Sequence, residues 1–224
     1  MLQHLQPLLD NSIKRRYSGG STIYYQGEIP RSACVLVEGV VKVFSISASG
    51  DEQIVLYHVP GEIFPSSYIF GKASSALFFY EALDDCQASF IPRQDLVDHI
   101  KAKPERMDAM LDYFTTNYSA SLVHVNALEQ PKARDKLLYI LYYLCQRYGE
   151  QGSDNTQIPF ALTHQNLASL VGLTRETTAT EMNKLKKQGL LTYNSQKYII
   201  SMPKLLDLIG EDSFRQLNIG VNGK

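Results

Sequence analysis

Short runs of hydrophobic and β-branched residues recur over residues 17–93, and glycines separate them. Glycines 27, 39, 50, 61 and 71 leave intervals of 12, 11, 11 and 10 residues. Short apolar runs with turn residues at this spacing are typical of a β-sandwich or barrel. The predicted strands are Thr22–Tyr25, Cys34–Val37, Val40–Phe44, Ile54–Tyr57, Leu77–Tyr80 and Ala88–Ile91. The first part of the chain is therefore predicted to form a β-roll.

From residue 94 the apolar spacing becomes helical, and Pro104 suits the first turn of a helix. The helix is expected to run for about 25 residues, or about 37 Å. Alternating spacings of three and four mark a heptad seam on it. The seam consists of Met107, Leu111, Phe114, Tyr118, Ser121, Val125 and Leu128. This stripe either packs on its own β-domain or pairs with a second copy, and its length favours a homodimer.

A third region begins after Pro131, which cannot continue the preceding helix, so residues 126–131 are the predicted hinge. Clustered leucines together with Ile140 predict a helix that ends near Tyr148. The polar segment 150–157 is predicted to be a loop. Residues 190–193 and 197–200 flank Asn194-Ser195-Gln196 as a hairpin, which is the last predicted element of regular structure.

Residues 163–188 are predicted to form two short helices joined by a tight turn. Thr163 and Thr174 are good N-caps for them, and Gly172 suits the left-handed position that ends the first helix. The second helix, Arg175–Gln188, should bury Thr178, Met182 and Leu185. Two such helices form a helix-turn-helix, and the hairpin that follows would be the wing of a winged helix.

The side chains at the starts of these helices suit contacts with double-stranded DNA. Arg175 can donate two parallel hydrogen bonds to guanine, and Glu176 can accept one from cytosine. The predicted base-reading residues are Arg175, Glu176, Ala179 and Thr180. The predicted phosphate contacts are Thr163, His164, Gln165, Thr174, Thr177 and Lys197. Lys184, Lys186 and Lys187 are interpreted as a solvated helix end.

Composition changes this picture mainly through the distribution of charge. The 224 residues carry a net charge of −1. Residues 1–130 hold 10 Lys/Arg and 15 Asp/Glu, a net of −5, and residues 131–224 hold 12 and 8, a net of +4. The neutral total therefore conceals an acidic first part and a mildly basic second part that carries the predicted DNA-binding elements.

Several other classes of protein find no support in the sequence. No apolar run is long enough for a membrane span, and no secretory signal pattern opens the chain. The three cysteines, Cys34, Cys86 and Cys145, lack metal-site spacing and are expected to be buried small hydrophobes in a cytoplasmic protein. No nucleophile triad, HExxH motif or phosphate-binding loop is present, which argues against an enzyme.

Two groups of motifs resemble the superfamily of the cyclic-AMP receptor protein and the fumarate–nitrate regulator (CRP/FNR), over nearly the full length. The first group is Val37-Glu38-Gly39-Val40-Val41-Lys42-Val43, Gly50-Asp51-Glu52-Gln53 and Pro60-Gly61-Glu62-Ile63-Phe64. The second group is Leu162-Thr163-His164-Gln165-Asn166-Leu167-Ala168 and Gly172-Leu173-Thr174-Arg175-Glu176-Thr177-Thr178. The resemblance implies a bacterial homodimer that contacts palindromic promoter DNA and RNA polymerase and activates or represses transcription.

The resemblance implies an α+β fold with three parts. Residues 1–103 would form a double-stranded β-helix (jelly roll) of the cyclic-nucleotide-binding type that acts as the sensor. Residues 104–130 would form the dimerisation helix and hinge, and residues 131–224 the winged helix-turn-helix domain.

The sequence departs from the family pattern where a cyclic nucleotide would bind. In nucleotide-binding members the phosphate cassette continues Phe-Gly-Glu, with Arg-Ser/Thr-Ala later. Here Pro65-Ser66-Ser67 follows Phe64, and the later segment is Ser74-Ser75-Ala76. A buried phosphate without its cation is costly, so cyclic AMP and cyclic GMP are not expected. The cysteine cluster of iron–sulfur members is also missing, whereas haem stays an open alternative because five histidines remain.

Aromatic residues gather in the same region, either as β-roll core or as a pocket for an apolar effector. The candidate pocket residues are Gly61, Phe64, Ser66, Ser67, Tyr68, Ser74, Ser75 and Phe79. A pocket closed by its own side chains would instead mean a ligand-independent regulator controlled by its expression level. A β-roll and winged helix that bind protein rather than DNA form a further alternative.

The recognition helix departs from the family pattern as well. The motif of the cyclic-AMP receptor protein runs Arg-Glu-Thr-x-x-Arg, and Thr180 takes the place of the last arginine. The predicted half-site is therefore related to the family's but altered at one base.

Overall fold

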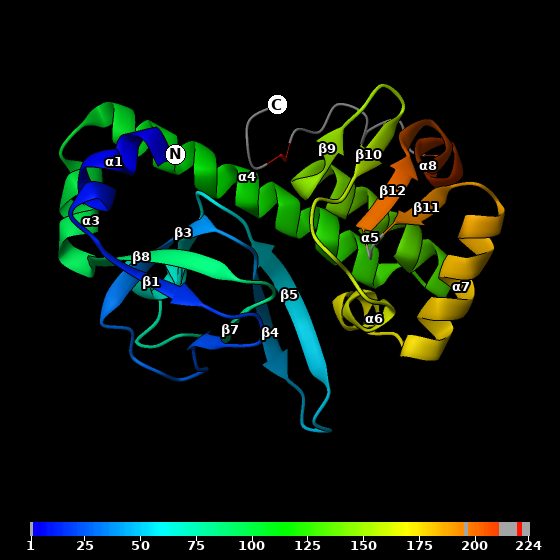
Figure 1. Ribbon diagram of the computed structural model, residues 1–224, viewed down its shortest axis with the longest axis horizontal. Coiled ribbons are helices and arrows are strands. Elements are labelled where there is room, and N and C mark those ends of the chain that lie inside the picture. Colours follow the sequence, from blue (N-terminus) through cyan, green and yellow to red (C-terminus); the bar gives the residue numbers. More distant parts are fainter. Residues whose placement is uncertain (1, 195–196, 211–218, 221–224) are drawn as a thin grey trace. The chain divides into compact units, whose positions relative to one another are not determined.

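Two antiparallel four-stranded sheets form the N-terminal unit of the computed structural model (Figure 1). The chain divides into two compact units, residues 1–113 and 114–224, and the structure describes residues 2–194, 197–210 and 219–220. The sheet orders in the first unit are β1-β8-β3-β6 and β2-β7-β4-β5. The strands are β1 (Ile13–Tyr17), β2 (Thr22–Tyr24), β3 (Ser32–Glu38), β4 (Val41–Ile46), β5 (Glu52–His58), β6 (Ile63–Phe64), β7 (Phe79–Ala82) and β8 (Cys86–Pro92).

All six predicted strands are present, with shifts of one or two residues at their ends. The pattern misses β1 because its Ile-Lys-Arg-Arg-Tyr sequence is mostly exposed and shows no apolar alternation. It misses β6 because this strand has only two residues.

The hydrophobic core of the β-roll lies between the two sheets, since both contribute buried residues to one cluster. Strand alternation directs Val41 and Val43 of β4 into this cluster. Lys42, between them, points to the other face. There its ammonium nitrogen lies 2.7 Å from a carboxylate oxygen of Glu52 and 3.0 Å from one of Glu81. The two ion pairs offset the cost of burying the charge of Lys42, a residue that is only 8% exposed.

Stacked rings occupy the part of the core next to β6. The ring of Phe64 lies parallel to His58, with centroids 4.8 Å apart, and parallel to Tyr80, with centroids 5.2 Å apart. Tyr24 meets Phe64 edge-on at 85°. Phe64 is fully buried, so this stack is a structural part of the β-roll.

Helices cover the outer face of the first sheet. Helices α1 (Leu2–Asp10) and α3 (Arg93–Lys101) contact β8 and bury Leu5, Leu9, Leu96 and Ile100 (Figure 1). The short helix α2 (Ser66–Ile69) follows β6 directly.

The long helix α4 (Pro104–Glu129) has 26 residues, as the heptad pattern predicts, and the boundary between the two compact units falls inside it. The predicted hinge, residues 126–131, is helical as far as Glu129. The helix is therefore interrupted only from residue 130 onward. Most of the predicted seam is exposed in the single chain, including Leu111 at 67%, Tyr118 at 65% and Val125 at 51%. Phe114 is half-buried.

The second unit is built around helix α5 (Ala133–Tyr148), most of which is buried and which packs, besides α4, against three other helices. These are α6 (His164–Val171), α7 (Arg175–Lys187) and α8 (Met202–Ile209). A third antiparallel sheet, of order β11-β12-β10-β9, completes the unit. Its strands are β9 (Glu150–Gln151), β10 (Asn155–Gln157), β11 (Leu191–Asn194) and β12 (Lys197–Ser201).

Two expectations for this unit were wrong. Residues 150–157 are not simply a loop, because β9 and β10 pair there and β10 also pairs with the wing strand β12. The chain also does not end its regular structure at the hairpin, since α8 follows it. The predicted wing strands are confirmed as β11 and β12, whereas Ser195 and Gln196 of the predicted turn lie outside the described residues.

We expect Phe64→Ala to lower the free energy of opening of the β-roll by about 3–5 kcal/mol, because it leaves a cavity beside the rings of His58 and Tyr80. Native-state hydrogen exchange of the β3 and β4 amides would measure it. Ile46→Ala is the control, since Ile46 is 52% exposed and should change that energy by about 0.5 kcal/mol or less. An opening energy for Phe64→Ala equal to that of the control would contradict the role of the stack.

Candidate DNA-binding site

The N-terminus of α6 is fixed by a reciprocal cap. The Thr163 hydroxyl accepts a hydrogen bond from the Asn166 amide at 3.1 Å, and the Thr163 amide donates to Asn166 Oδ1 at 2.9 Å. The predicted cap is therefore confirmed, with Asn166 as its second half. The same hydroxyl donates to Asn166 Oδ1 at 2.7 Å, so its proton already has an acceptor. Thr163 thus fixes the start of α6, and its hydroxyl proton is already used within the cap rather than offered to a phosphate.

The turn between the two helices has the predicted geometry. Gly172 adopts the left-handed conformation, with φ +65° and ψ +40°, which a residue with a Cβ adopts only at a cost. Thr174 then caps α7 by accepting from the Thr177 amide at 3.1 Å and donates its proton to the Thr177 hydroxyl at 2.9 Å. The Thr177 hydroxyl is left with its own proton to donate outward.

Helix α7 has one buried and one exposed face, as predicted. Thr178, Met182 and Leu185 are each at most 2% exposed and hold the helix on the core of the unit. Arg175, Glu176 and Thr180 are exposed, and Ala179 is half-buried beside them. Four candidate base-reading residues therefore share the first turns of one helix and project away from the protein. Their contacts with bases stay a prediction.

The candidate phosphate contacts gather at two helix N-termini and on the wing. His164 and Gln165 occupy the first turn of α6, and Thr174 and Thr177 the first turn of α7. The first amides of a helix have no partner within it and attract anions. The caps use the amides of Asn166 and Thr177, so the earlier amides of each helix face outward. Lys197, at the start of β12, is half-buried.

His164 has an electrostatic environment of its own. Partial burial lowers the pKa of His164, and the positive charge of Arg175 lowers it further. Both causes disfavour the imidazolium form in the free protein. A phosphate beside the ring would act in the opposite direction.

The C-terminal end of α7 differs from its start. Lys184 pairs with Glu181 at 2.7 Å, and Lys186 and Lys187 are exposed. These lysines also complement the negative end of the helix dipole. The arrangement agrees with their interpretation as a solvated helix end.

Sequence reasoning did not single out Tyr193 on the wing strand β11. It is 42% exposed, and its ring lies 4.8 Å from that of Tyr198. The signal available in the sequence was an aromatic residue next to the wing turn, which is as common in a core as at a surface.

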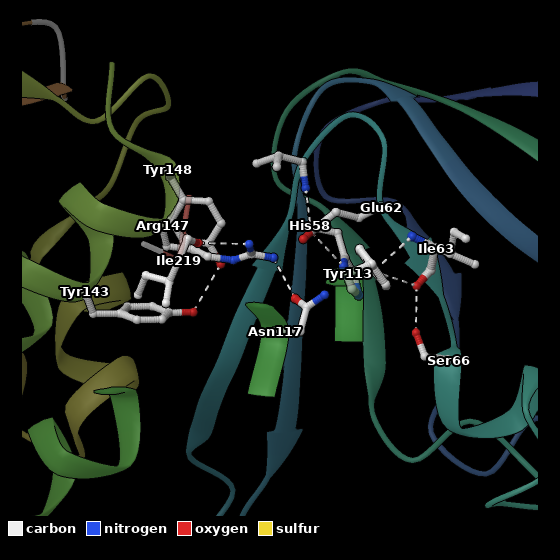
Figure 2. Close-up of polar contacts among 11 residues, drawn as sticks. His58, Glu62, Ile63, Ser66, Tyr113, Asn117, Tyr143, Arg147, Tyr148 and Ile219 are labelled. Carbon is white, nitrogen blue, oxygen red and sulfur yellow. Dashed lines mark hydrogen bonds and ion pairs between the residues drawn. The ribbon is translucent and has the colours of Figure 1, made fainter. Parts of the chain in front are cut away.

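The candidate effector residues do not form a single group. Phe64 lies in the stack on the inner side of the second sheet, whereas Phe79 lies on its outer side and stacks on Phe44 at 5.2 Å. Ser66 donates its hydroxyl to the Ile63 carbonyl at 2.8 Å (Figure 2). Tyr68 lies beneath the Arg93 guanidinium at 5.7 Å. Gly61 donates its amide to the Leu36 carbonyl at 2.9 Å. Ser74 is exposed and Ser75 half-buried in the loop before β7.

Comparisons with known proteins agree on both units. A model of the cyclic nucleotide-binding domain matches residues 14–103, and a model of the Crp-like helix-turn-helix domain matches residues 135–208. The chain is 26% identical to the anaerobic regulatory protein of Aggregatibacter actinomycetemcomitans, over 93% of this chain and 81% of that protein. It is 26% identical to the nitrogen fixation regulation protein FixK of Rhizobium meliloti, over 92% of both. The chain belongs to the CRP/FNR family.

Solved structures of related proteins have the same fold. FixK2 of Bradyrhizobium japonicum matches with a TM-score of 0.71 at 19% identity, over 88% of this chain and 96% of that one. A CooA mutant of Carboxydothermus hydrogenoformans matches with a TM-score of 0.76 at 19% identity, over 93% and 94%. CRP/FNR proteins are DNA-binding transcriptional regulators rather than enzymes, and they form dimers.

Within this CRP/FNR chain the three cysteines are buried, as predicted. Burial raises the pKa of the Cys34 and Cys145 thiols and that of Cys86 to about 11, so all three are protonated at neutral pH. The described residues contain no group of three or more His, Cys, Asp or Glu side chains that could hold a metal ion. None of the described helices is long and apolar enough to cross a membrane.

We expect the His164 imidazole to titrate with a midpoint below its ordinary 6.5, as followed by nuclear magnetic resonance at several pH values. Arg175→Ala should move the midpoint up toward 6.5, because it removes one of the two causes. Lys187→Ala removes the same charge about 18 Å along the helix, beyond the screening length, and should leave the midpoint in place. A midpoint that does not respond to Arg175→Ala would contradict this electrostatic coupling.

Proposed function

We propose that this CRP/FNR protein acts as a homodimer that reads a palindromic promoter site with α7 and responds at the β-roll to a signal other than a cyclic nucleotide. One observation carries the first part of the proposal. The first turns of α7 expose Arg175, Glu176 and Thr180, while the opposite face of the helix is anchored in the core. A recognition helix needs this combination to bring side chains to base edges in the major groove.

Each exposed side chain of α7 suits a base. The Arg175 guanidinium matches the O6 and N7 acceptors of guanine, and the Glu176 carboxylate matches the N4 donor of cytosine. The Thr180 hydroxyl can donate or accept, and the Ala179 methyl can pack on the methyl group of thymine. Thr180 is too short for the second guanine contact that an arginine makes, so the half-site differs at that base.

Phosphate contacts would come from the helix N-termini and the wing. The outward amides of α6 and α7 and the Thr177 hydroxyl are donors in place before binding. His164 would gain a favourable charge by taking up a proton beside a phosphate. Binding through His164 would therefore be coupled to proton uptake and favoured as the pH falls from 8 toward 6.

A dimer along α4 would place two α7 helices on one face of the DNA. The exposed seam from Met107 to Leu128 gives each chain an apolar stripe that a second copy can bury. Successive major grooves on one side of B-DNA lie about 34 Å apart, so the dimer fixes the half-site separation. RNA polymerase is the proposed partner at the promoter.

The chemistry of the cassette supports a signal other than cyclic AMP. Where nucleotide-binding members carry a glutamate and an arginine, this chain has neutral side chains, and the Ser66 hydroxyl donates its hydrogen bond to the Ile63 carbonyl. The buried stack around Phe64 supports either an apolar effector or regulation without a small molecule.

We expect Arg175→Ala to weaken binding to the preferred palindrome by about 1–3 kcal/mol per half-site and to relax the preference at one base pair. Selection from a random DNA pool, followed by fluorescence anisotropy, would measure both. Lys187→Ala removes the same charge from the solvated end of α7 and should keep the base preference. An unchanged preference in Arg175→Ala would refute the assignment of Arg175 as a base reader.

We expect no rise in the melting temperature of the protein with millimolar cyclic AMP or cyclic GMP, because no cation is supplied for the phosphate. The selected palindrome serves as the positive control and should raise it. A saturable rise with either nucleotide would sink this part of the proposal. Full DNA binding without ligand, and no stabilisation by any metabolite pool, would instead select the ligand-independent alternative.

A further inference from the structure

Two helix C-termini meet at a single lysine in the second unit. The last carbonyls of a helix have no partner within it, and they form the negative end of its dipole. Lys136, in the first turn of α5, donates to the carbonyl of Leu128 at the end of α4 at 2.7 Å. It also donates to the carbonyl of Val171 at the end of α6 at 3.4 Å. One ammonium group thus bridges the ends of two helices.

A buried histidine makes a second connection between the same two helices. The His124 ring of α4 is 8% exposed, and its Nε2 lies 2.8 Å from the Leu170 carbonyl in the last turn of α6. Because a carbonyl only accepts, Nε2 carries the proton in this contact. The ring also stacks on Tyr143 of α5, with centroids 5.2 Å apart. Two adjacent carbonyls of α6 are therefore satisfied by two different helices.

A third connection joins α4 to α5 farther along. The Arg147 guanidinium is 4% exposed and donates to Asn117 Oδ1 of α4 at 2.6 Å (Figure 2). It also donates to the Ile219 carbonyl at 3.2 Å. Asn117 and His124 lie seven residues apart, so their side chains lie on one side of α4, and the Leu128 carbonyl lies at the C-terminal end of that helix.

We propose that Lys136 and His124 are positioning residues that fix the helix-turn-helix on α4, so that the dimer helix sets the direction of the recognition helix. This inference deepens the proposed function and rests on it, since it concerns how a dimer holds two α7 helices at one separation. The apolar contacts of α5 hold the second unit together but are not directional. Hydrogen bonds from fixed side chains to helix-end carbonyls are directional, and they lie at the joint itself.

The contacts assign the two residues a role in dimer geometry and none in the reading of a single half-site. Lys136 and His124 act at the C-terminal end of α6, whereas the candidate DNA contacts lie at the N-terminal ends of α6 and α7. Loosening the joint would leave each recognition surface intact. It would reduce the advantage of having the second surface held in register.

The test compares half-site spacings with a palindromic duplex obtained by selection from a random DNA pool. Dissociation constants are measured by fluorescence anisotropy for the optimal duplex, for duplexes with one or two base pairs added or removed at the centre, and for a single half-site. The wild-type protein should show a sharp optimum, because each base pair rotates the second half-site around the DNA axis.

Lys136→Met keeps the length of the side chain and removes its donor. We expect its affinity for a single half-site to stay within about twofold of wild type and its affinity for the optimal palindrome to fall about tenfold, which flattens the spacing profile. His124→Phe, which keeps a ring against Tyr143, should flatten the profile in the same way. Lys136→Arg keeps the cation and should restore the optimum.

Lys132→Met is the matched control, since it removes the same charge from the exposed N-cap residue of the same helix. It should keep the sharp optimum. If Lys136→Met retains the wild-type profile, or if Lys132→Met flattens it equally, the joint is overturned while the proposed function stands. A wild-type protein that binds the palindrome no better than a half-site would overturn both.

Discussion

The polarity of the α-helix is the constraint on which the second unit depends. Each helix leaves amides unbonded at its start and carbonyls unbonded at its end, and a folded chain has to satisfy or expose them. The carbonyl end of α4 accepts from the Lys136 side chain, and the carbonyl end of α6 accepts from those of Lys136 and His124. The amide ends of α6 and α7 face outward, and only one amide of each is used by a threonine cap. The negative helix ends are therefore closed by the protein, and the positive ends are offered to an anion.

Helix α4 links this arrangement to the β-roll. Tyr113 accepts a hydrogen bond from the Ile63 amide of β6 at 3.3 Å, next to the cassette, and the buried Glu62 accepts from the Val59 amide at 3.1 Å nearby (Figure 2). The same helix reaches the helix-turn-helix through His124. The cassette is thus bonded to the first part of a helix whose second part is bonded to α6. The same helix also carries the exposed apolar stripe that we propose as the dimer seam.

Much of the site could be predicted because its deciding interactions are local. Thr163, Gly172 and Thr174 act within three or four residues of their own positions, so their geometry follows from the sequence around them. The buried face of α7 follows from spacings of four and three between Thr178, Met182 and Leu185. The short strand β10 was not predictable in this way. Its Asn-Thr-Gln sequence is polar, and it becomes a strand through pairing with β9 and with β12, which lies more than 40 residues later.

The distinction between local and distant interactions also separates Lys136 from the lysines at the C-terminal end of α7. The lysine-rich end of α7 stands out in the sequence as a run of charge. In the structure Lys184 is paired with Glu181, and Lys186 and Lys187 are exposed. Lys136 could not be singled out in this way, because its acceptors are backbone carbonyls 8 and 35 residues away. Every residue has a backbone carbonyl, so the residue types in a sequence do not mark these acceptors. The acceptor of His124 is 46 residues away. A conspicuous run of charge can therefore be a solvated surface, as the sequence predicted, while the cation proposed to orient the DNA-binding elements lies in no such run. Only the positions of the helix ends in the folded chain distinguish Lys136 from the lysines at the end of α7.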